Sequence, residues 1–188
     1  MSRHKPITAL LIDGARFDDA IQWLYQEYSD LTPLLLLRGT DYEPIAEAGT
    51  ILIETPTGSP IHRHWQSGAN GMSDAVWLES WIPIQALFSS LQRRLRILAP
   101  DGREFWLRPG LAEPLRQAWK EGLQWPEGFW FGIDRVSLHH EGSTYCAWSN
   151  STPEHDCTRP SDNPLQAQVV LDWPLLQALS ANDPQEVD

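Results

Sequence analysis

The sequence predicts a single layered domain of the α/β or α+β class, with a mixed sheet, helices packed on it and an acidic C-terminal extension. Three observations lead to this prediction. Short apolar runs alternate with apolar stripes at helical spacing through the first 120 residues. A Pro100-Asp101-Gly102 turn between two short runs indicates an antiparallel hairpin, so part of the sheet is antiparallel. The chain of 188 residues, 41% of them hydrophobic, is long enough to bury one core.

The first half of the chain reads as four strands with helical segments between them. The runs ITALLID, TPLLLLR and TILIE are short, apolar and ended by Gly or Pro, which is typical of buried strands. Between them, apolar residues at helical spacing predict a helix over 15–29 and a short turn near 42–47. Residues 61–71 are ambiguous and are assigned a short helix that ends at the glycines, and residues 75–79 a fourth strand.

The second half contains the clearest helix and the hairpin. A helix is expected from Ser80, acting as its cap, and Pro83, with an apolar stripe that continues to Leu95. The hairpin pairs residues 95–99 with 104–108, and a further helix runs from Pro109 to Gly122. The remaining predictions are strands over 129–140 and 144–148 paired across Glu141-Gly142, a mobile polar loop over 149–164, a strand over 167–171, and a final helix that begins near Pro174.

Charge is unevenly distributed along the chain. The sequence has 14 basic and 25 acidic residues, a net charge of −11. Residues 1–136 sum to −4, whereas residues 137–188 sum to −7 and contain a single basic residue, Arg159. We therefore divide the chain into a core over 1–136 and an acidic extension over 137–188. So acidic a chain is not expected to bind nucleic acid, because phosphates require clustered Lys and Arg.

Several functional classes lack their sequence signals. The apolar run at the amino terminus is too short for a signal peptide, and none approaches the roughly 20 residues of a membrane span, so we expect a soluble, cytoplasmic protein without membrane partners. The chain contains neither a G-x-S-x-G elbow nor a glycine-rich phosphate loop. Two Cys are too few for a disulfide framework. We expect no enzyme activity and no cofactor.

Titratable residues that end a strand or cluster in sequence are the remaining candidates for chemistry. Asp13 ends the first strand, where it either contacts a ligand or, as we favour, caps the next helix. The His62/His64, His139/His140 and His155/Cys157 groups are interpreted as surface or hydrogen-bonded residues rather than metal ligands. If a metal were bound, its first ligands would be sought among Cys146, His155 and Cys157.

Arg and Trp residues form the candidate partner-binding surface. The chain has 10 Trp, and Arg94, Arg96, Arg103 and Arg108 lie on or beside the hairpin. In a strand, Arg94 and Arg96 would project to the same side, and Arg103 would join them across the hairpin. The alternatives are a solvated face paired with the chain's own carboxylates for the Arg residues, and burial in the core or beneath loops for most of the Trp residues. The predicted partner-binding residues are Arg94, Arg96, Arg103, Arg108, Trp106 and Trp148.

The order of these motifs resembles a known family, the effector adaptors or chaperones of the bacterial type VI secretion system. The resemblance covers about residues 7–136, and its most specific piece is the hairpin Asp101–Arg108. The other matching segments are Leu-Leu-Ile-Asp13-Gly14-Ala15, Pro33–Leu35 with Gly39-Thr40, Ala48–Ile53, Trp77–Ser80, Leu91–Arg96 and Phe131–Ile133. The family commonly continues the hairpin Arg with Asp-Pro-Arg, whereas this chain has Pro109-Gly110-Leu111, so any contact that depends on that triplet is made differently here.

The resemblance implies a non-enzymatic protein that binds a toxic effector and promotes its loading onto the VgrG or PAAR spike. The partners expected from it are the effector and the spike protein. An alternative is an immunity protein, which would bind the toxin alone and block it. A third hypothesis, a small hydrolase that uses the histidine clusters, would require a metal.

Overall fold

The chain folds into an α+β domain built on a six-stranded sheet. The computed structural model describes residues 5–180. Its strands are β1 (Ile7–Asp13), β2 (Pro33–Leu35), β3 (Thr50–Glu54), β4 (Val76–Ser80), β5 (Arg96–Leu98), β6 (Glu104–Trp106), β7 (Ile133–His140) and β8 (Ser143–Ser149). Its α-helices are α1 (Ala20–Glu27), α2 (Pro60–Ser67), α3 (Ile84–Gln92), α4 (Ala112–Lys120) and α5 (Trp173–Ser180), and 3₁₀ helices cover Gly14–Arg16, Glu43–Ala48 and Ala69–Asp74. The predicted layered fold is confirmed in its α+β form.

Six strands pair in the order β2-β3-β1-β4-β7-β8, and every pairing is antiparallel rather than mixed. β5 and β6 form a separate two-stranded hairpin. The one parallel contact that the structure describes is an isolated bridge between Leu98 and Val170. The predicted strand over 167–171 is therefore a single bridge that ties the C-terminal region to β5.

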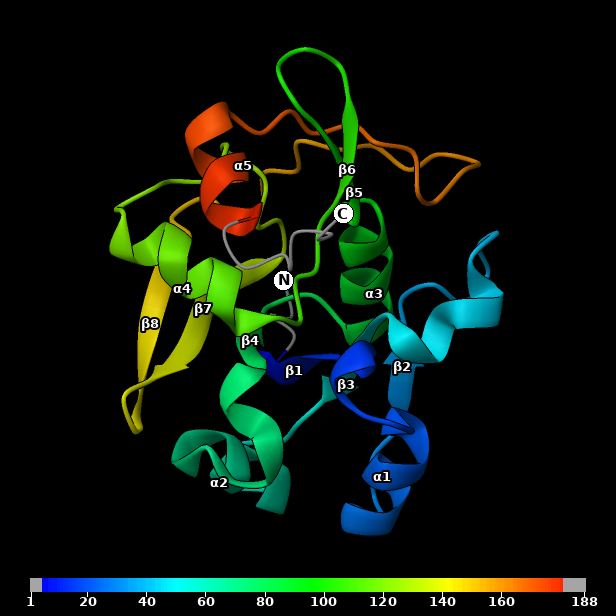
Figure 1. Ribbon diagram of the computed structural model, residues 1–188, viewed down its shortest axis with the longest axis vertical. Coiled ribbons are helices and arrows are strands. Elements are labelled where there is room, and N and C mark those ends of the chain that lie inside the picture. Colours follow the sequence, from blue (N-terminus) through cyan, green and yellow to red (C-terminus); the bar gives the residue numbers. More distant parts are fainter. Residues whose placement is uncertain (1–4, 181–188) are drawn as a thin grey trace, which may run out of the picture.

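The core lies on both faces of the central strands. β3 and β4 are buried along most of their length, and β1 is fully buried from Ala9 to Asp13. Strands that are covered on both faces read as continuous apolar runs, which explains ITALLID and TILIE. In Figure 1, α1 and α2 lie at one end of the molecule, and α5 lies beside the β5–β6 hairpin at the other end.

The start of α3 differs from the prediction. Ser80 was expected to cap this helix, but it is the last residue of β4, and Pro83 occupies the cap position. The Ser80 hydroxyl instead donates to the carbonyl oxygens of Gly132 (2.8 Å) and Ile82 (3.1 Å). A buried hydroxyl requires partners, and here the two carbonyl groups next to the strand end provide them.

Residues beyond 136 contribute to the same core as those before. β7 runs across position 136, and Leu138, Trp148, Leu171 and Leu175 are buried with the N-terminal strands. The division of the chain at residue 136 stays a prediction, and the end of the expected acidic extension, residues 181–188, lies outside the described residues. No helix within residues 5–180 is long and apolar enough to cross a bilayer.

Candidate functional site: an apolar groove beside the hairpin

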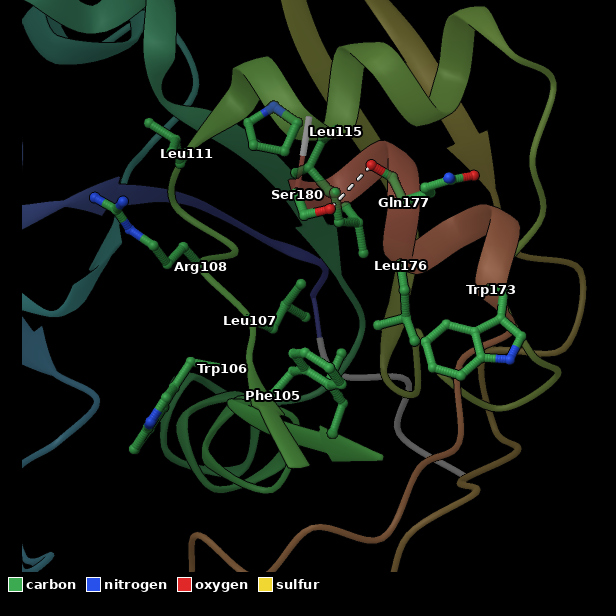
Figure 2. Close-up of a pocket in the computed structure, with 13 residues that line it drawn as sticks. Phe105, Trp106, Leu107, Arg108, Leu111, Leu115, Trp173, Leu176, Gln177 and Ser180 are labelled. Carbon is green, nitrogen blue, oxygen red and sulfur yellow. Dashed lines mark hydrogen bonds between the residues drawn. The ribbon is translucent and has the colours of Figure 1, made fainter. Parts of the chain in front are cut away.

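A groove of about 500 Å³ runs between the hairpin, α4 and α5. Figure 2 shows Phe105 and Leu107 facing Trp173 and Leu176 of α5 across this space, whereas Trp106, Arg108 and Leu111 point to the other side of the hairpin segment. The lining consists of Ile97, Phe105, Trp106, Leu107, Arg108, Leu111, Pro114, Leu115, Trp173, Leu176, Gln177, Leu179 and Ser180. We call this surface the hairpin groove. Arg108 is its single charged lining residue among those the structure describes, so the groove presents mainly hydrocarbon and aromatic surface.

Three aromatic side chains of the groove are exposed to solvent. Phe105 is 38% exposed, Trp106 46% and Trp173 44%. Single exposed apolar residues are ordinary, but several of them around one hollow mark an interaction surface. Trp is also among the residues that contribute most to binding energy in protein interfaces. The hairpin groove is therefore suited to bury apolar side chains of a protein partner.

A second hollow of about 270 Å³ lies on the other side of the same segment. It shares Trp106, Leu107 and Arg108 with the hairpin groove, and Tyr42 and Ile45 contribute to its outer wall. The Tyr42 ring contacts the Trp106 ring edge to face at 4.9 Å between centroids. The two hollows flank the segment that follows β6, so one partner segment lying across Trp106 would contact both.

β6 is the outer strand of the hairpin, because β5 is held by the domain on its other side. The Ala99 amide donates to the carbonyl of Arg103 (2.8 Å), and the Asp101 carboxylate accepts from the Arg103 amide (3.1 Å). Gly102 has a φ of 86°, which an L side chain rarely adopts. On its other side, β5 is held by bonds from the Leu98 amide to Val169 and from the Leu171 amide to Leu98. All three residues of β6 remain exposed.

Arg108 and Asp13 fix the segment after β6 to the central strand. The Arg108 guanidinium donates to the Asp13 carboxylate at 2.7 Å, and Asp13 is 4% exposed. The other Asp13 oxygen accepts from the Ala15 amide at 3.0 Å, so the expected capping role is confirmed on the 3₁₀ helix that follows β1. Asp13 thus has a structural role at the edge of the second hollow, where it contacts two elements at once.

Arginine side chains form the rim of the hairpin groove. Arg96 pairs with Glu104, and its guanidinium lies over the Trp106 ring at 5.3 Å from the centroid. The Arg103 guanidinium lies 5.6 Å from the Phe105 ring and 5.5 Å from the Trp173 ring. Arg103 therefore connects the hairpin to the first residue of α5. Such cation–π contacts help to hold the aromatic rings in place. Phe105, Trp106 and Trp173 nevertheless remain exposed to solvent.

Two of the six predicted partner-binding residues lie away from this groove. Arg94 precedes β5 instead of belonging to it, and it is 2% exposed, so the expected common face with Arg96 and Arg103 is wrong. Its guanidinium donates to the carbonyl of Gly128, to the Ser90 side chain and to Asp156 at 2.7 Å. Such a buried cation requires this full set of acceptors.

Trp148 is also buried, and its indole N–H donates to the carbonyl of Leu123 at 3.2 Å. The other four predicted residues, Arg96, Arg103, Trp106 and Arg108, surround the groove.

The loop over 149–164, expected to be mobile, is anchored through Asp156. Arg93 and Arg94 each donate to one of its carboxylate oxygens, at 3.0 and 2.7 Å. Burial raises the pKa of Asp156, but hydrogen bonds from the Thr158 amide and from Arg94 outweigh it and hold the pKa below its ordinary value. The carboxylate therefore stays charged and links this loop to the end of α3.

His62, His64 and His155 have structural partners, whereas His139, interpreted from the sequence as a surface or hydrogen-bonded residue, is buried and its Nε2 has no hydrogen-bond partner within residues 5–180. His62 accepts a hydrogen bond from the Gly58 amide (2.9 Å) and stacks on Trp77, and burial lowers its pKa. His64 contacts the Tyr28 hydroxyl at 2.6 Å. His155 lies 3.2 Å from Glu127. Within residues 5–180, no three His, Cys, Asp or Glu side chains gather in a way that could hold a metal ion.

The α5 wall of the groove is not predicted from the sequence. The sequence predicts only a final helix that begins near Pro174 and a short turn near 42–47, which carries Tyr42 and Ile45 of the second hollow. Trp173 is an amphipathic aromatic residue at a helix start, directly before Pro174, and this was the one signal available. Its position opposite the hairpin depends on a contact between segments about 70 residues apart, which no local pattern reveals.

A comparison with protein-family models matches the part of the chain that contains the hairpin. Residues 10–122 match the model described as "Domain of unknown function (DUF4123)". The chain belongs to the DUF4123 family. The match runs from β1 to just beyond α4, so it includes the hairpin and α4, whereas α5 lies outside it. No curated protein matches the chain, and no solved structure does. DUF4123 is associated with the effector adaptors of the type VI secretion system.

Proposed function

We propose that this protein is a non-enzymatic adaptor that binds a cognate type VI secretion effector and promotes its loading onto the VgrG or PAAR spike. The association of DUF4123 with effector adaptors supports the general role. The observation that supports a binding function at a defined site is the hairpin groove, with its exposed Phe105, Trp106 and Trp173.

The composition of the groove favours protein binding over catalysis. Its lining contains no Asp, Glu, His or Cys, so the described wall residues offer no nucleophile with an adjacent base. A central aromatic cluster with a rim of arginines is the typical arrangement of a protein interface. The rim ion pairs are exposed, and such pairs contribute little to stability, so a partner's charges can replace them.

The two walls of the groove suggest how one family serves different effectors. The hairpin wall lies inside the DUF4123 match, and the α5 wall lies outside it. We assign the shared part of binding to the hairpin and the discrimination between effectors to Trp173, Leu176 and Gln177 on α5.

The experiment is co-expression with the proteins encoded by the neighbouring genes, followed by affinity purification and size exclusion. An adaptor should yield a complex that contains both a toxin and a spike protein. An immunity protein would yield toxin alone, with the toxin's activity suppressed. Recovery of neither would contradict the proposed function.

The groove itself is tested with matched variants in the same experiment. Leu176→Glu places a charge in the groove and should abolish recovery of the effector. Tyr25→Glu places the same charge on exposed α1, far from the groove in sequence, and should leave recovery unchanged. Equal recovery with both variants would exclude the groove as the effector site.

A further inference from the structure

β8 is an edge strand without the features that normally prevent edge pairing. It is the last strand of the six-stranded sheet and lies at the rim of the molecule in Figure 1. Its seven residues, Ser143–Ser149, include no charged residue and no proline. Natural edge strands are usually protected by Lys, Pro or short length, because an open row of backbone groups pairs with other strands.

The hairpin geometry identifies the backbone groups that face outward. Glu141 and Gly142 both have positive φ (49° and 82°), as in a two-residue turn, so His140 and Ser143 form the hydrogen-bonded closing pair. Pairs then alternate along the strand, and the backbone N–H and C=O groups of Thr144 and Cys146 point away from β7. Within residues 5–180, no backbone hydrogen bond outside the regular elements satisfies these groups.

A bulge sets the length of the segment that can pair. Ser137 lies opposite Cys146 and Val136 opposite Trp148, so Ala147 is an extra residue. The regular, outward-facing part of the edge is therefore Ser143–Cys146. Because a bulge interrupts regular pairing, a strand that pairs with β8 would do so only over this short segment, and the affinity would be moderate.

The charges at the two ends of this edge are opposite. Arg135, opposite Ser149 on β7, has a side chain that is 55% exposed, and Glu141 at the turn has one that is 83% exposed. Arg135 lies 3.5 Å from Glu79 and also interacts with the Cys146 side chain of β8, and Glu141 lies 3.4 Å from His140. Exposed ion pairs of this kind contribute little energy. An identical strand added in the antiparallel direction brings the Glu141 end of one copy beside the Arg135 end of the other.

Aromatic surface lies next to the centre of the same edge. The Tyr145 ring packs on Trp119 of α4 at 4.2 Å between centroids, and Trp119 is among the exposed large side chains. A two-fold axis near Tyr145 would place the two Trp119 rings on one face of the joined sheet. Two strands paired through Thr144 and Cys146 would share four main-chain hydrogen bonds. Burial of the Trp119 surface would add an apolar contribution to the binding free energy.

From the open edge, the opposite charges at its ends and the adjacent aromatic surface, we propose that β8 pairs antiparallel with β8 of a second copy of this chain. Tyr145 lies near the two-fold axis, and Thr144 of each copy bonds to Cys146 of the other. The result is a symmetric dimer with a continuous sheet, of the isologous kind that is commonest among homo-oligomers. The dimer uses β8 and Trp119 near the end of α4, whereas the hairpin groove is lined by the β5–β6 hairpin, α5 and residues at the start of α4, Leu111, Pro114 and Leu115.

The test is sedimentation equilibrium of the full chain over a concentration series, with thermal melts as a check on folding. The wild type should associate reversibly to a dimer. Thr144→Pro removes an outward N–H that the fold does not use, so it should abolish the dimer while the melting temperature stays close to that of the wild type.

A charge swap provides evidence independent of proline. Arg135→Glu and Glu141→Arg should each raise the dimer dissociation constant at least about fivefold, since each affects two symmetric pairs. The double variant should recover most of the wild-type affinity. The matched control, Arg38→Glu, makes the same charge change on an exposed residue beside β2, at the opposite edge of the sheet, and should have no effect.

A monomeric wild type at every concentration would overturn the proposal. A dimer that persists in Thr144→Pro, or a double charge variant no tighter than the singles, would equally do so. Loss of an effector complex in Thr144→Pro with a monomeric wild type would assign the edge to a different protein and refute pairing between copies.

Discussion

Replacement of Arg94 by Ala should destabilise the protein severely, although the residue belongs to a basic cluster that looks like a surface patch in the sequence. The side chain is 3% exposed, and it donates to the carbonyls of Ser90, Gly128 and Phe129 and to Asp156. Removing one partner of a buried ion pair costs about 3–5 kcal/mol, because the remaining charge is left uncompensated. For a chain of this size, that loss lowers the melting temperature by roughly 6–20 °C.

The assay is urea unfolding followed by circular dichroism, on Arg94→Ala and on the control Arg103→Ala. Arg103 is 65% exposed and pairs with Asp101 on the surface, so its replacement should change the unfolding free energy by less than about 0.5 kcal/mol. A double-mutant cycle with Asp156→Ala should give a coupling energy of about 1–3 kcal/mol. If Arg94→Ala loses less than about 1 kcal/mol, the buried network does not carry the stability assigned to it.

The same network predicts a pH dependence. The pKa of Asp156 is lower in the folded protein than its ordinary value of 3.8. Its contribution to stability is therefore complete above that ordinary value, and it is lost as the pH falls through the lower folded pKa. Between pH 5 and pH 2, the wild type should lose more stability than Asp156→Asn, as measured by urea unfolding at each pH. Parallel curves would contradict the role of this carboxylate.

Three further predictions concern other parts of the fold. The Tyr145 hydroxyl is buried without a hydrogen-bond partner, and burial raises its pKa to about 12. Tyr145→Phe should therefore be neutral or stabilising at pH 7. In thermal melts between pH 10 and 12, the variant should lose less stability than the wild type, because only the wild type has a hydroxyl that ionises more readily in the unfolded chain. Gly110→Ala should cost about 1–3 kcal/mol or more in urea unfolding, because a Cβ there would lie 2.5 Å from the backbone of Ile12; an unchanged midpoint would show that the backbone yields. Truncation after Gly142 removes β8 and the buried Leu171 and should abolish the cooperative melt, whereas a native-like melt would show that the first part of the chain folds alone.

Local chemistry predicted the local elements well. The Pro100-Asp101-Gly102 turn gave the β5–β6 hairpin, and the Glu141-Gly142 turn gave the pairing of β7 with β8. The apolar run TILIE corresponds to β3 without a shift in its boundaries. These elements are specified by residues adjacent to them, so a reading of short segments finds them.

The features that the sequence does not predict depend on contacts between residues far apart in the chain. Arg94 has the appearance of a surface cation until Asp156, 62 residues later, is placed beside it. The groove requires α5 to meet the hairpin, and the contacts of Trp173 with Arg103 link distant segments. Four of six predicted binding residues still surround the groove, because the hairpin that carries them is itself a local element.

The most direct test of the account is the affinity of the co-purified effector for groove variants of the full chain, measured by isothermal titration calorimetry. Trp106→Ala and Trp173→Ala should each weaken binding by about 1–3 kcal/mol, which is roughly fivefold to 150-fold, as for aromatic hot spots. Tyr25→Ala, which truncates a still more exposed aromatic ring on α1, should bind like the wild type. Wild-type affinity in both Trp variants, with their folding intact, would contradict the assignment of the hairpin groove as the effector site.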